Sequence, residues 1–284
     1  MMSRSILILV CVSLAAGSVG TRATQSTQMP RASDSLKFAV LGNSGTGSDA
    51  QVETAKQVEK VRQSFPFELV LLTGNNVTGS QRPQDFIKTF EGPYKPLLSA
   101  NVRFYAVLGS KDDPKQQYYQ LFNMNRRRYY AVSAKDVQFF VLDTKHFDAA
   151  EVAWLDTQLT ASHSGWKIVV LHDPLYSSAP PDDASNDLRE ALEPLLVKHQ
   201  VSAVFAGRDQ VYERSVPQQG ITHFVVGSSG RLHKDSLDRS SKIRANGFDR
   251  DNAFVVAEVV GNQLFFSAIS RTGEVVDSGV IARR

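Results

Sequence analysis

Cysteine is almost absent from this chain of 284 residues, which contains only Cys11. Cys11 lies inside the apolar run 6–14 close to the N-terminus. The chain beyond residue 23 therefore has no disulfide, no thiolate metal ligand and no cysteine nucleophile. An apolar core must hold the fold together without covalent crosslinks, and a chain of this length can bury a large one.

An excess of charge of one sign is also lacking. The chain has 32 Lys and Arg against 29 Asp and Glu, a formal net charge of +3. This is too little to indicate nucleic-acid binding by itself. Basic residues cluster at 126–128 and recur between 231 and 244, but such runs are usually solvated faces. No known nucleic-acid motif occurs, so we expect no nucleic-acid partner.

Long apolar runs are missing too, since residues 6–14 are too few to span a membrane. Arg4 precedes this run, small residues follow it at 15–20, and Thr21-Arg22-Ala23 offers a small-x-small cleavage site. This pattern predicts a signal peptide over residues 1–23, a secreted or periplasmic protein and no stable membrane anchor. We expect the polar stretch 24–35 to be a flexible lead-in and 36–284 to form one domain.

Hydrophobic periodicity predicts an alternation of strands and helices over the first two thirds of the chain. The expected strands are 37–41, 68–73, 103–108, 167–171 and 202–206, and the expected helices are 49–64, 83–90, 148–162 and 188–199. Residues 129–133 and 137–143 predict a hairpin. Consecutive strands are expected at 222–226, 254–259, 264–270 and 275–281. This order indicates an α/β core with an antiparallel or mixed second sheet.

Five short motifs each follow a predicted strand. They read GNSG at 42–45, GNN at 74–76, GSKD at 109–112, HDPLYSS at 172–178 and GRDQ at 207–210. In α/β sheets, ligand sites lie outside the carboxyl ends of the strands. We therefore expect the five loops to form one site.

In order and spacing the loops resemble those of the calcineurin-like metallophosphoesterases, most closely the purple acid phosphatase-like branch. That family typically carries GDxG, GDN, GNHD, HHPLYSS and GHDH at these places. The resemblance implies an α/β fold, a four-layer sandwich of two mixed β-sheets flanked by helices. It also implies a metal-dependent phosphoesterase that uses two divalent metals, Fe, Mn or Zn.

Nearly every position that the family uses for metal or catalysis holds another residue here. The resemblance aligns two aspartate ligands with Asn43 and Asn75, an asparagine ligand with Ser110, a histidine that assists the leaving group with Lys111, and two histidine ligands with Arg208 and Gln210. His172 alone is unchanged at a ligand position. Its usual histidine neighbour is Asp173.

These changes weaken metal binding for chemical reasons. The amide oxygen of Asn75 is neutral and cannot bridge two dications as a carboxylate does. Protonated Lys111 and Arg208 have no lone pair to donate and repel a cation at contact range. We therefore predict that the dinuclear centre is lost, that no catalytic residue is functional and that no cofactor is bound. A weak remnant metal site at His172, Asp112, Asp173 and Asp209 stays open.

Three functions follow as hypotheses. The first is an inactive pseudophosphatase that binds a phosphate-bearing or other anionic ligand, or a protein partner, through Asn43, Asn75, Lys111, His172 and Arg208. The charge balance at the site supports this first hypothesis. Loss of two metals removes four positive charges, while loss of two aspartates removes two negative charges and the two new cations add two positive charges, so the net charge is unchanged. Neutral drift of the same positions is the alternative. The second is an active phosphoric monoester hydrolase, similar to acid phosphatases, with a remnant metal. The third is a secreted structural protein without a ligand.

Overall fold

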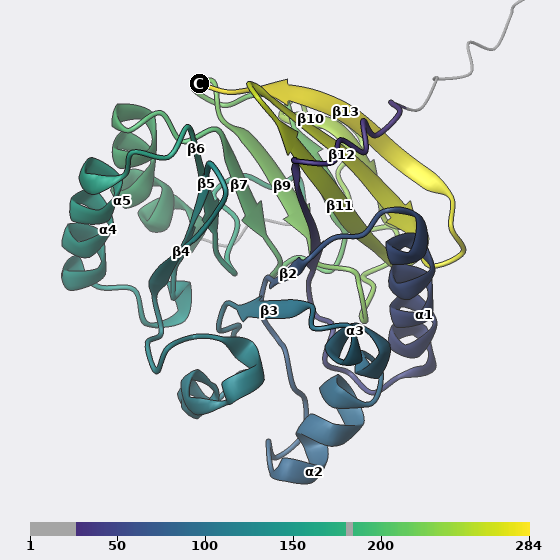
Figure 1. Ribbon diagram of the computed structural model, residues 1–284. Coiled ribbons are helices and arrows are strands. Elements are labelled where there is room, and N and C mark those ends of the chain that lie inside the picture. The colour runs from purple at the N-terminus through teal and green to yellow at the C-terminus, as the bar shows by residue number, and fades with distance from the viewer. Residues whose placement is uncertain (1–26, 180–183) are drawn as a thin grey trace, which may run out of the picture.

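The computed structural model describes residues 27–179 and 184–284, and the predicted signal peptide at 1–23 lies outside them (Figure 1). Two β-sheets face each other and helices cover their outer faces, so the predicted layers of two mixed sheets flanked by helices are confirmed. No helix within the described ranges has the length and apolar character that crossing a membrane requires.

The first sheet combines a parallel half with an antiparallel half. Its order is β13 (Val275–Ala282), β12 (Gln263–Ser270), β11 (Ala253–Val260), β1 (Leu36–Leu41), β2 (Leu69–Leu72) and β3 (Arg103–Ala106). β1, β2 and β3 are parallel, whereas β11 pairs antiparallel with β1 and continues into an antiparallel meander. Every residue of β1 and β2 is buried, as expected for strands covered on both faces.

The second sheet has seven strands. Its order is β10 (Arg244–Phe248), β8 (Tyr212–Ser215), β9 (Thr222–Val226), β7 (Ala203–Ala206), β6 (Trp166–Val170), β5 (Val137–Val141) and β4 (Tyr130–Ala134). β4 and β5 form the predicted hairpin, and β5, β6, β7 and β9 are parallel. β8 and β10 were not predicted, because YERS and RANGF are short and lack apolar alternation.

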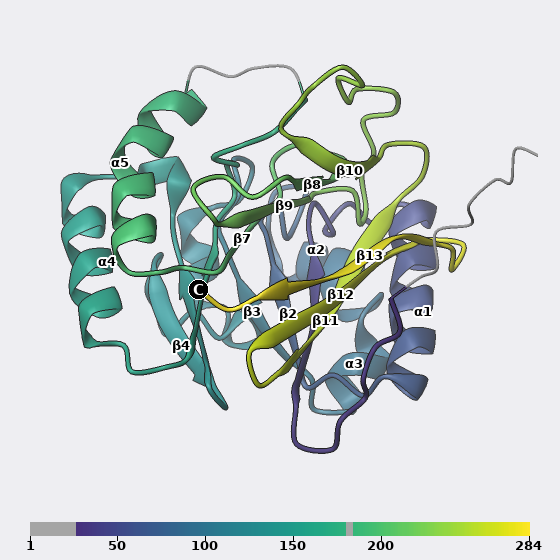
Figure 2. The same ribbon diagram turned by 90° about the horizontal axis from the view of Figure 1, so that it is seen from above.

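The main core lies between the two sheets and is rich in aromatic rings. Phe38 of β1 meets Phe139 of β5 and Phe205 of β7 edge to face, with ring centroids 5.3 and 6.1 Å apart. A second apolar cluster fills the space between the second sheet and two helices, α4 (Ala149–Ala161) and α5 (Ala184–Lys198). Figure 2 shows these two helices side by side on one flank and α1 (Asp49–Ser64) on the opposite flank. The paired sheets thus give the loops at their ends a rigid base.

The two long N-terminally capped helices begin where the sequence predicts. Ser48 caps α1 by accepting a hydrogen bond from the Gln51 N–H, and Asp148 caps α4 by accepting one from the Glu151 N–H. In α4, Val152 is half-buried, whereas Glu151, Leu155 and Leu159 are buried.

The expected helix at 83–90 has a different form. It starts as α2 (Pro83–Phe86) and continues as a π-helical turn, η1 (Ile87–Glu91), in which the Gly92 N–H donates to the Ile87 carbonyl at 2.8 Å. A further helix, α3 (Lys95–Ser99), follows before β3. Three short 3₁₀ turns complete the described elements: η2 (Pro114–Tyr118), η3 (Gln120–Phe122) and η4 (Thr144–His146).

Candidate functional site

The five predicted loops meet at one edge of the paired sheets and are held together by backbone hydrogen bonds. The Asn43 N–H donates to the Gly74 carbonyl at 3.0 Å, and the Gly207 and Arg208 N–H groups donate to the His172 carbonyl at 3.0 and 2.8 Å. The Lys111 N–H donates to the Asn75 side-chain oxygen at 2.9 Å. This geometry agrees with the expectation, based on the ends of the predicted strands, that the five loops form one site.

Glycine is required where these loops pack most closely. Gly74 has a φ of +101°, and a Cβ there would lie 2.4 Å from His172 Nδ1. A Cβ on Gly109 would lie 2.2 Å from the Asn75 nitrogen. Such distances are far below van der Waals contact, so both glycines permit the close approach that brings His172 and Asn75 together.

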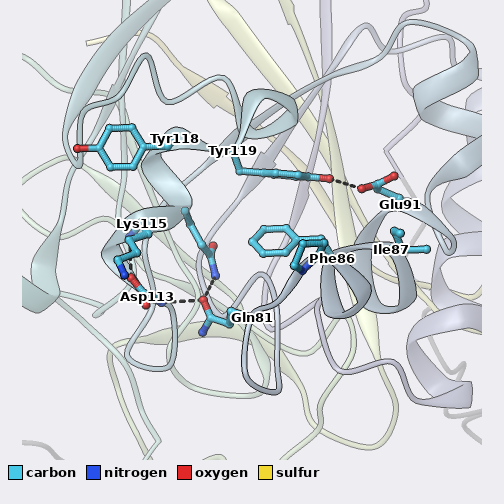
Figure 3. A pocket seen from close by; sticks show the side chains of 10 residues that line it. Gln81, Phe86, Ile87, Glu91, Asp113, Lys115, Tyr118 and Tyr119 are labelled. Atoms are coloured by element: carbon cyan, nitrogen blue, oxygen red, sulfur yellow. Dashed lines mark hydrogen bonds between the residues drawn. The ribbon is translucent and has the colours of Figure 1, made fainter.

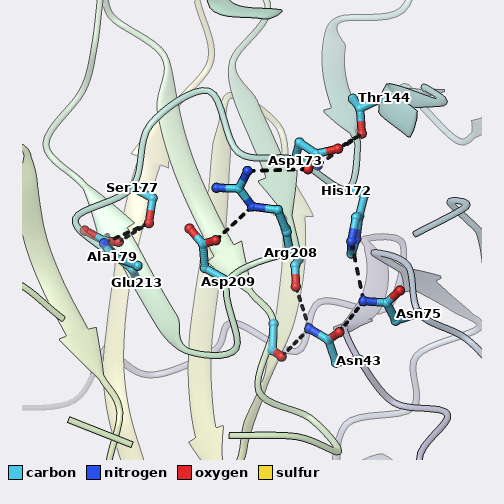
Figure 4. Close-up of polar contacts among 12 residues, drawn as sticks. Asn43, Asn75, Thr144, His172, Asp173, Ser177, Ala179, Arg208, Asp209 and Glu213 are labelled. Carbon is cyan, nitrogen blue, oxygen red and sulfur yellow. Dashed lines mark hydrogen bonds and ion pairs between the residues drawn. The ribbon is translucent and has the colours of Figure 1, made fainter. Parts of the chain in front are cut away.

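The side chains of Asn43 and Asn75 form a buried, directional hydrogen-bond network (Figure 4). Asn43 Nδ2 donates to the carbonyls of Gly207 and Gly227, both at 2.7 Å. Asn75 Nδ2 donates to Asn43 Oδ1 at 2.6 Å. Both asparagines have left-handed backbones, with φ of 50° and 56°, a conformation that asparagine tolerates well. The two amides therefore replace two carboxylates and also suit the turns.

His172 extends this network. Its ring is fully buried, and Nδ1 lies 2.8 Å from the Thr73 carbonyl oxygen, which can only accept. Nδ1 therefore carries a proton, and in the neutral ring Nε2 holds the lone pair. Nε2 faces Asn75 Nδ2 at 3.5 Å. The imidazole lone pair thus points at an amide N–H.

The amide orientations are mutually determined. Two carbonyl acceptors fix Asn43 Nδ2, so Asn43 Oδ1 must face Asn75. Asn75 then presents Nδ2 to Asn43 Oδ1, and its own oxygen accepts the Lys111 N–H. Amide assignments rest on such networks. The donor set consequently does not fit a pair of divalent ions, because the amide oxygens are already bonded to N–H groups and an N–H faces the imidazole of His172.

Arg208 lies between two carboxylates (Figure 4). Its Nε is 3.0 Å from Asp209 Oδ1, and its Nη1 is 3.6 Å from Asp173 Oδ1. Thr144 Oγ1 donates to the other oxygen of Asp173 at 2.5 Å. The guanidinium charge is therefore compensated inside the site by these two carboxylates.

Three other predicted residues, Ser110, Lys111 and Gln210, keep their side chains outside the amide network. Ser110 and Lys111 are exposed, and Gln210 is half-buried. The Lys111 carbonyl accepts from Gln81 Nε2 at 2.7 Å, and the Gln210 carbonyl accepts from the His233 N–H at 2.8 Å. No residue in the described ranges accepts a hydrogen bond from the Lys111 ammonium. These side chains stay outside the amide network.

The remnant metal site does not assemble. Asp112 is buried and accepts from the N–H groups of Asn76 at 2.9 Å and Gly109 at 2.8 Å, and from Gln116 Nε2 at 2.8 Å. Burial raises the pKa of the Asp112 carboxyl, while these hydrogen bonds oppose the rise. Asp173 and Asp209 face Arg208. Over residues 27–179 and 184–284, no three His, Cys, Asp or Glu side chains form a group that could hold a metal ion.

A cavity of about 540 Å³ borders the site at Thr144 and Asp173. Its charged lining residues are Asp148, Asp173 and Asp187, without a lysine or arginine among the described residues that form it. Like charges repel, so this cavity disfavours an anionic ligand.

Two important residues were missed by the sequence analysis. Thr73 supplies the carbonyl that orients His172, and its Oγ1 donates to the Val226 carbonyl at 3.0 Å. Its place directly before Gly74 is a signal that could have revealed it. Thr144 positions Asp173 from a separate 3₁₀ turn, and nothing in the sequence links the two.

Comparisons with known proteins agree with this architecture. The family model of calcineurin-like phosphoesterases matches residues 36–207. Tartrate-resistant acid phosphatase type 5 of Oryctolagus cuniculus is 24% identical over 268 residues, covering 77% of this chain and 80% of that protein. Probable purple acid phosphatase 20 of Arabidopsis thaliana is 24% identical over 259 residues, covering 82% of this chain and 56% of that protein.

Solved structures share the fold at lower identity. GAP50 of Plasmodium superposes with a TM-score of 0.74 at 20% identity, covering 88% of this chain and 89% of that one. Purple acid phosphatase PPD1 of yellow lupin (Lupinus luteus) gives a TM-score of 0.73 at 18% identity, covering 90% of this chain and 55% of that one. The match over more than half of its length shows that the chain belongs to the calcineurin-like phosphoesterase family.

Proposed function

We propose that this chain is a non-catalytic phosphoesterase-fold protein that acts by binding a partner. The observation that carries the proposal is the closed network of Asn43, Asn75 and His172 at the place where the family positions its metals. This network uses the polar atoms that a metal would need. Among residues 27–179 and 184–284, no group of three His, Cys, Asp or Glu side chains offers a place for a bridging ion.

Energetics favour the network over a metal. Admitting a cation requires Asn75 to give up its bond to Asn43, and Asn43 Oδ1 would then lose its described donor. A buried polar group left without a partner costs about 1–3 kcal/mol. Coordination by neutral amide oxygens and one imidazole would offset little of this free-energy cost, because borderline divalent metals need anionic ligands or several imidazoles.

The rival hypothesis is an active phosphoric monoester hydrolase. Turnover of p-nitrophenyl phosphate, measured with added Mn, Fe or Zn on freshly repurified protein, separates the two. We expect no turnover above that of the His172→Ala variant. Metal-dependent turnover that is lost in His172→Ala would overturn the proposal. The variant with Asn43→Asp, Asn75→Asp, Ser110→Asn, Lys111→His, Arg208→His and Gln210→His tests whether the scaffold still supports catalysis.

An anion-binding role at the same loops is less well supported. Arg208 is already paired with Asp173 and Asp209, and the adjoining cavity is acidic. Thermal shift with inorganic phosphate tests the role, because a bound ligand raises the melting temperature by mass action. We expect no rise. A rise that disappears in Lys111→Ala combined with Arg208→Ala would restore the anion-binding hypothesis.

Two further observations bear on the role. GAP50, whose fold this chain shares, is described as the anchor in the inner membrane complex of Plasmodium, so this fold also occurs in a protein with an anchoring role. For this chain, we propose export through residues 1–23, supported by their sequence pattern. Expression in a host with a secretory pathway, followed by N-terminal sequencing, tests this. Retention with Met1 or Met2 still present would contradict it.

A further inference from the structure

A second cavity lies apart from the amide network, between the α2–η1 segment and the 3₁₀ turn η2. Its volume is about 370 Å³, within the usual size range of ligand pockets. Five of the ten residues that line it are apolar or aromatic: Pro83, Phe86, Ile87, Tyr118 and Tyr119 (Figure 3). The Phe86 and Tyr119 rings pack at a centroid distance of 4.3 Å. We call it the aromatic pocket.

The backbone that builds the aromatic pocket is unusual at two places. Ile87 and Glu91 lie at the two ends of the π-helical turn η1, a conformation found frequently at functional sites. Gln81, on the opposite wall, has a φ of 55° although it is not a glycine. Strained backbone of this kind persists only where the surroundings hold it, and it is concentrated at binding and active sites.

The rim of the pocket exposes large apolar side chains. Tyr118 is 61% exposed, Ile87 is 56% exposed and Leu121, on the next turn, is 38% exposed. A small molecule inside the cavity would leave this rim in water. Apolar surface of this kind typically marks contact with another protein, whose surface can cover both cavity and rim.

Two carboxylates, Glu91 and Asp113, and one cation, Lys115, also line the pocket, and Glu91 is the carboxylate bonded to the aromatic wall. Glu91 Oε1 accepts from the Tyr119 hydroxyl at 2.7 Å, and no residue of the described chain donates to its second oxygen. Burial and the neighbouring Glu91 carboxylate together raise the pKa of Tyr119, so its hydroxyl stays protonated and keeps this carboxylate in place. A carboxylate beside an aromatic wall suits a ligand that combines an apolar body with a cationic end.

Hydrogen bonds also connect the pocket to the loop that carries Lys111. Gln81 Nε2 donates to the Lys111 carbonyl, and Gln81 Oε1 accepts from the Asp113 N–H at 2.9 Å and from Gln116 Nε2 at 2.8 Å. Gln116 in turn donates to Asp112 Oδ1 at 2.8 Å. The loop at 109–112 thus helps to hold one wall of the aromatic pocket.

We propose that the aromatic pocket is the docking site for a protein partner that inserts an aromatic side chain and places an adjacent Lys or Arg against Glu91. The pocket supplies the apolar wall, Ile87 and Tyr118 extend the contact, and the free Glu91 oxygen selects the cation. This specifies the binding role proposed above, yet it does not depend on whether the amide network excludes metals. Its test measures peptide binding alone, so the two proposals fail separately.

The test uses acetyl-Trp-Lys-amide and acetyl-Trp-Glu-amide as probes, with binding followed by NMR line broadening or calorimetry. We expect the lysine peptide to bind about two- to fivefold more tightly, the range given by an exposed ion pair. Glu91→Gln should make the two peptides equal. Ile87→Ser should weaken both, whereas Val275→Ser, an exposed apolar residue on the distant strand β13, should weaken neither.

Several results would overturn the proposal. Equal binding of the two peptides to the wild type, no binding of either, or unchanged binding to Ile87→Ser would each do so. Sedimentation provides a further check on the occupant. Self-association of the wild type that disappears in Ile87→Ser would show that a second copy of this chain fills the pocket. Circular dichroism of each variant verifies folding before any loss of binding is interpreted.

Discussion

The loop cluster and the aromatic pocket differ in how their side chains are satisfied. In the cluster, Asn43, Asn75 and His172 are buried and hydrogen-bonded to one another and to the backbone. In the aromatic pocket, Ile87 and Tyr118 are more than half exposed, and Glu91 keeps an acceptor without a described donor. The comparison teaches that polar groups of the loop cluster are satisfied within the protein, whereas the aromatic pocket leaves apolar surface and an acceptor open.

Asn75→Asp should produce the largest effect on the buried side of this comparison. The new carboxylate oxygen would face Asn43 Oδ1 across 2.6 Å, in place of an N–H donor. We expect a loss of about 3–5 kcal/mol in the free energy of unfolding at pH 7.5, as for an uncompensated buried charge. Urea denaturation measures it.

The pH dependence of this loss gives a second test. The buried carboxyl would have a raised pKa, so protonation below the unfolded-state pKa of about 3.9 restores a donor and removes the cost. The penalty should therefore grow as pH rises from 4 to 7.5. Asn101→Asp is the matched control, because Asn101 has the same left-handed backbone but is exposed. Equal stability of the two variants at pH 7.5 would contradict the network.

A second buried histidine, His223, lies outside the amide network, and its effect on the free energy of unfolding can be compared with that of His172. Both ring nitrogens of His223 are buried without a hydrogen-bond partner in the described chain, and burial lowers its pKa from 6.5 to about 3. As pH falls, His223 takes up a proton in the unfolded chain at a higher pH than in the folded protein. The free energy of unfolding that is present above pH 6.5 therefore decreases as pH falls. At pH 5 the loss attributable to His223 should be about 2 kcal/mol.

His223→Phe should remove this acid sensitivity. Urea titrations at pH 7.5 and pH 5 should show a smaller difference for the variant than for the wild type. His172→Phe should instead lose stability at both pH values, because it removes the acceptor for Asn75 and the donor to Thr73. An unchanged pH slope in His223→Phe would show that the imidazole finds a partner.

Arg208→Ala should have an intermediate effect. It leaves Asp173 and Asp209 without the guanidinium that lies between them. We expect a loss of about 1–2 kcal/mol, between the values for exposed and fully buried ion pairs. Lys111→Ala is the control, and its exposed side chain should change stability by less than about 0.5 kcal/mol. A larger loss in Lys111→Ala than in Arg208→Ala would reverse the roles assigned to the two cations.

Ile87→Ser should have the smallest effect on stability. Ile87 is 56% exposed, and surface substitutions usually change the free energy of unfolding by less than about 0.5 kcal/mol. The aromatic pocket would thus tolerate a change that removes its binding, in contrast to the loop cluster. A loss above 2 kcal/mol in thermal or urea unfolding would show that Ile87 is structural instead.

Much of the fold could be predicted from apolar periodicity and turn residues. The helix at Asp49–Ser64 and the strand at Thr222–Val226 have the bounds expected from the sequence. The convergence of the five loops followed from strand ends. β8 could not be predicted, because its Glu213 and Arg214 are held by the Ser178 N–H and by Asp277 rather than by an apolar pattern.

The site was harder to predict than the fold. Residue types alone indicated that metal ligands are missing, but not that Arg208 would be neutralised by Asp173 and Asp209. The ion pair with Asp173 joins two loops that follow different strands, the pair with Asp209 lies within one loop, and only the packed structure sets both distances. The aromatic pocket was missed because it depends on the π-helical turn of Ile87–Glu91, and that turn has no distinct hydrophobic period.

Metal content tests the central idea most directly. Purified wild-type protein is dialysed against manganese, exchanged into metal-free buffer and measured by inductively coupled plasma mass spectrometry beside His172→Ala. The amide network predicts that both proteins retain manganese only at the level of the buffer blank. Two manganese ions per wild-type chain, lost in His172→Ala, would contradict it.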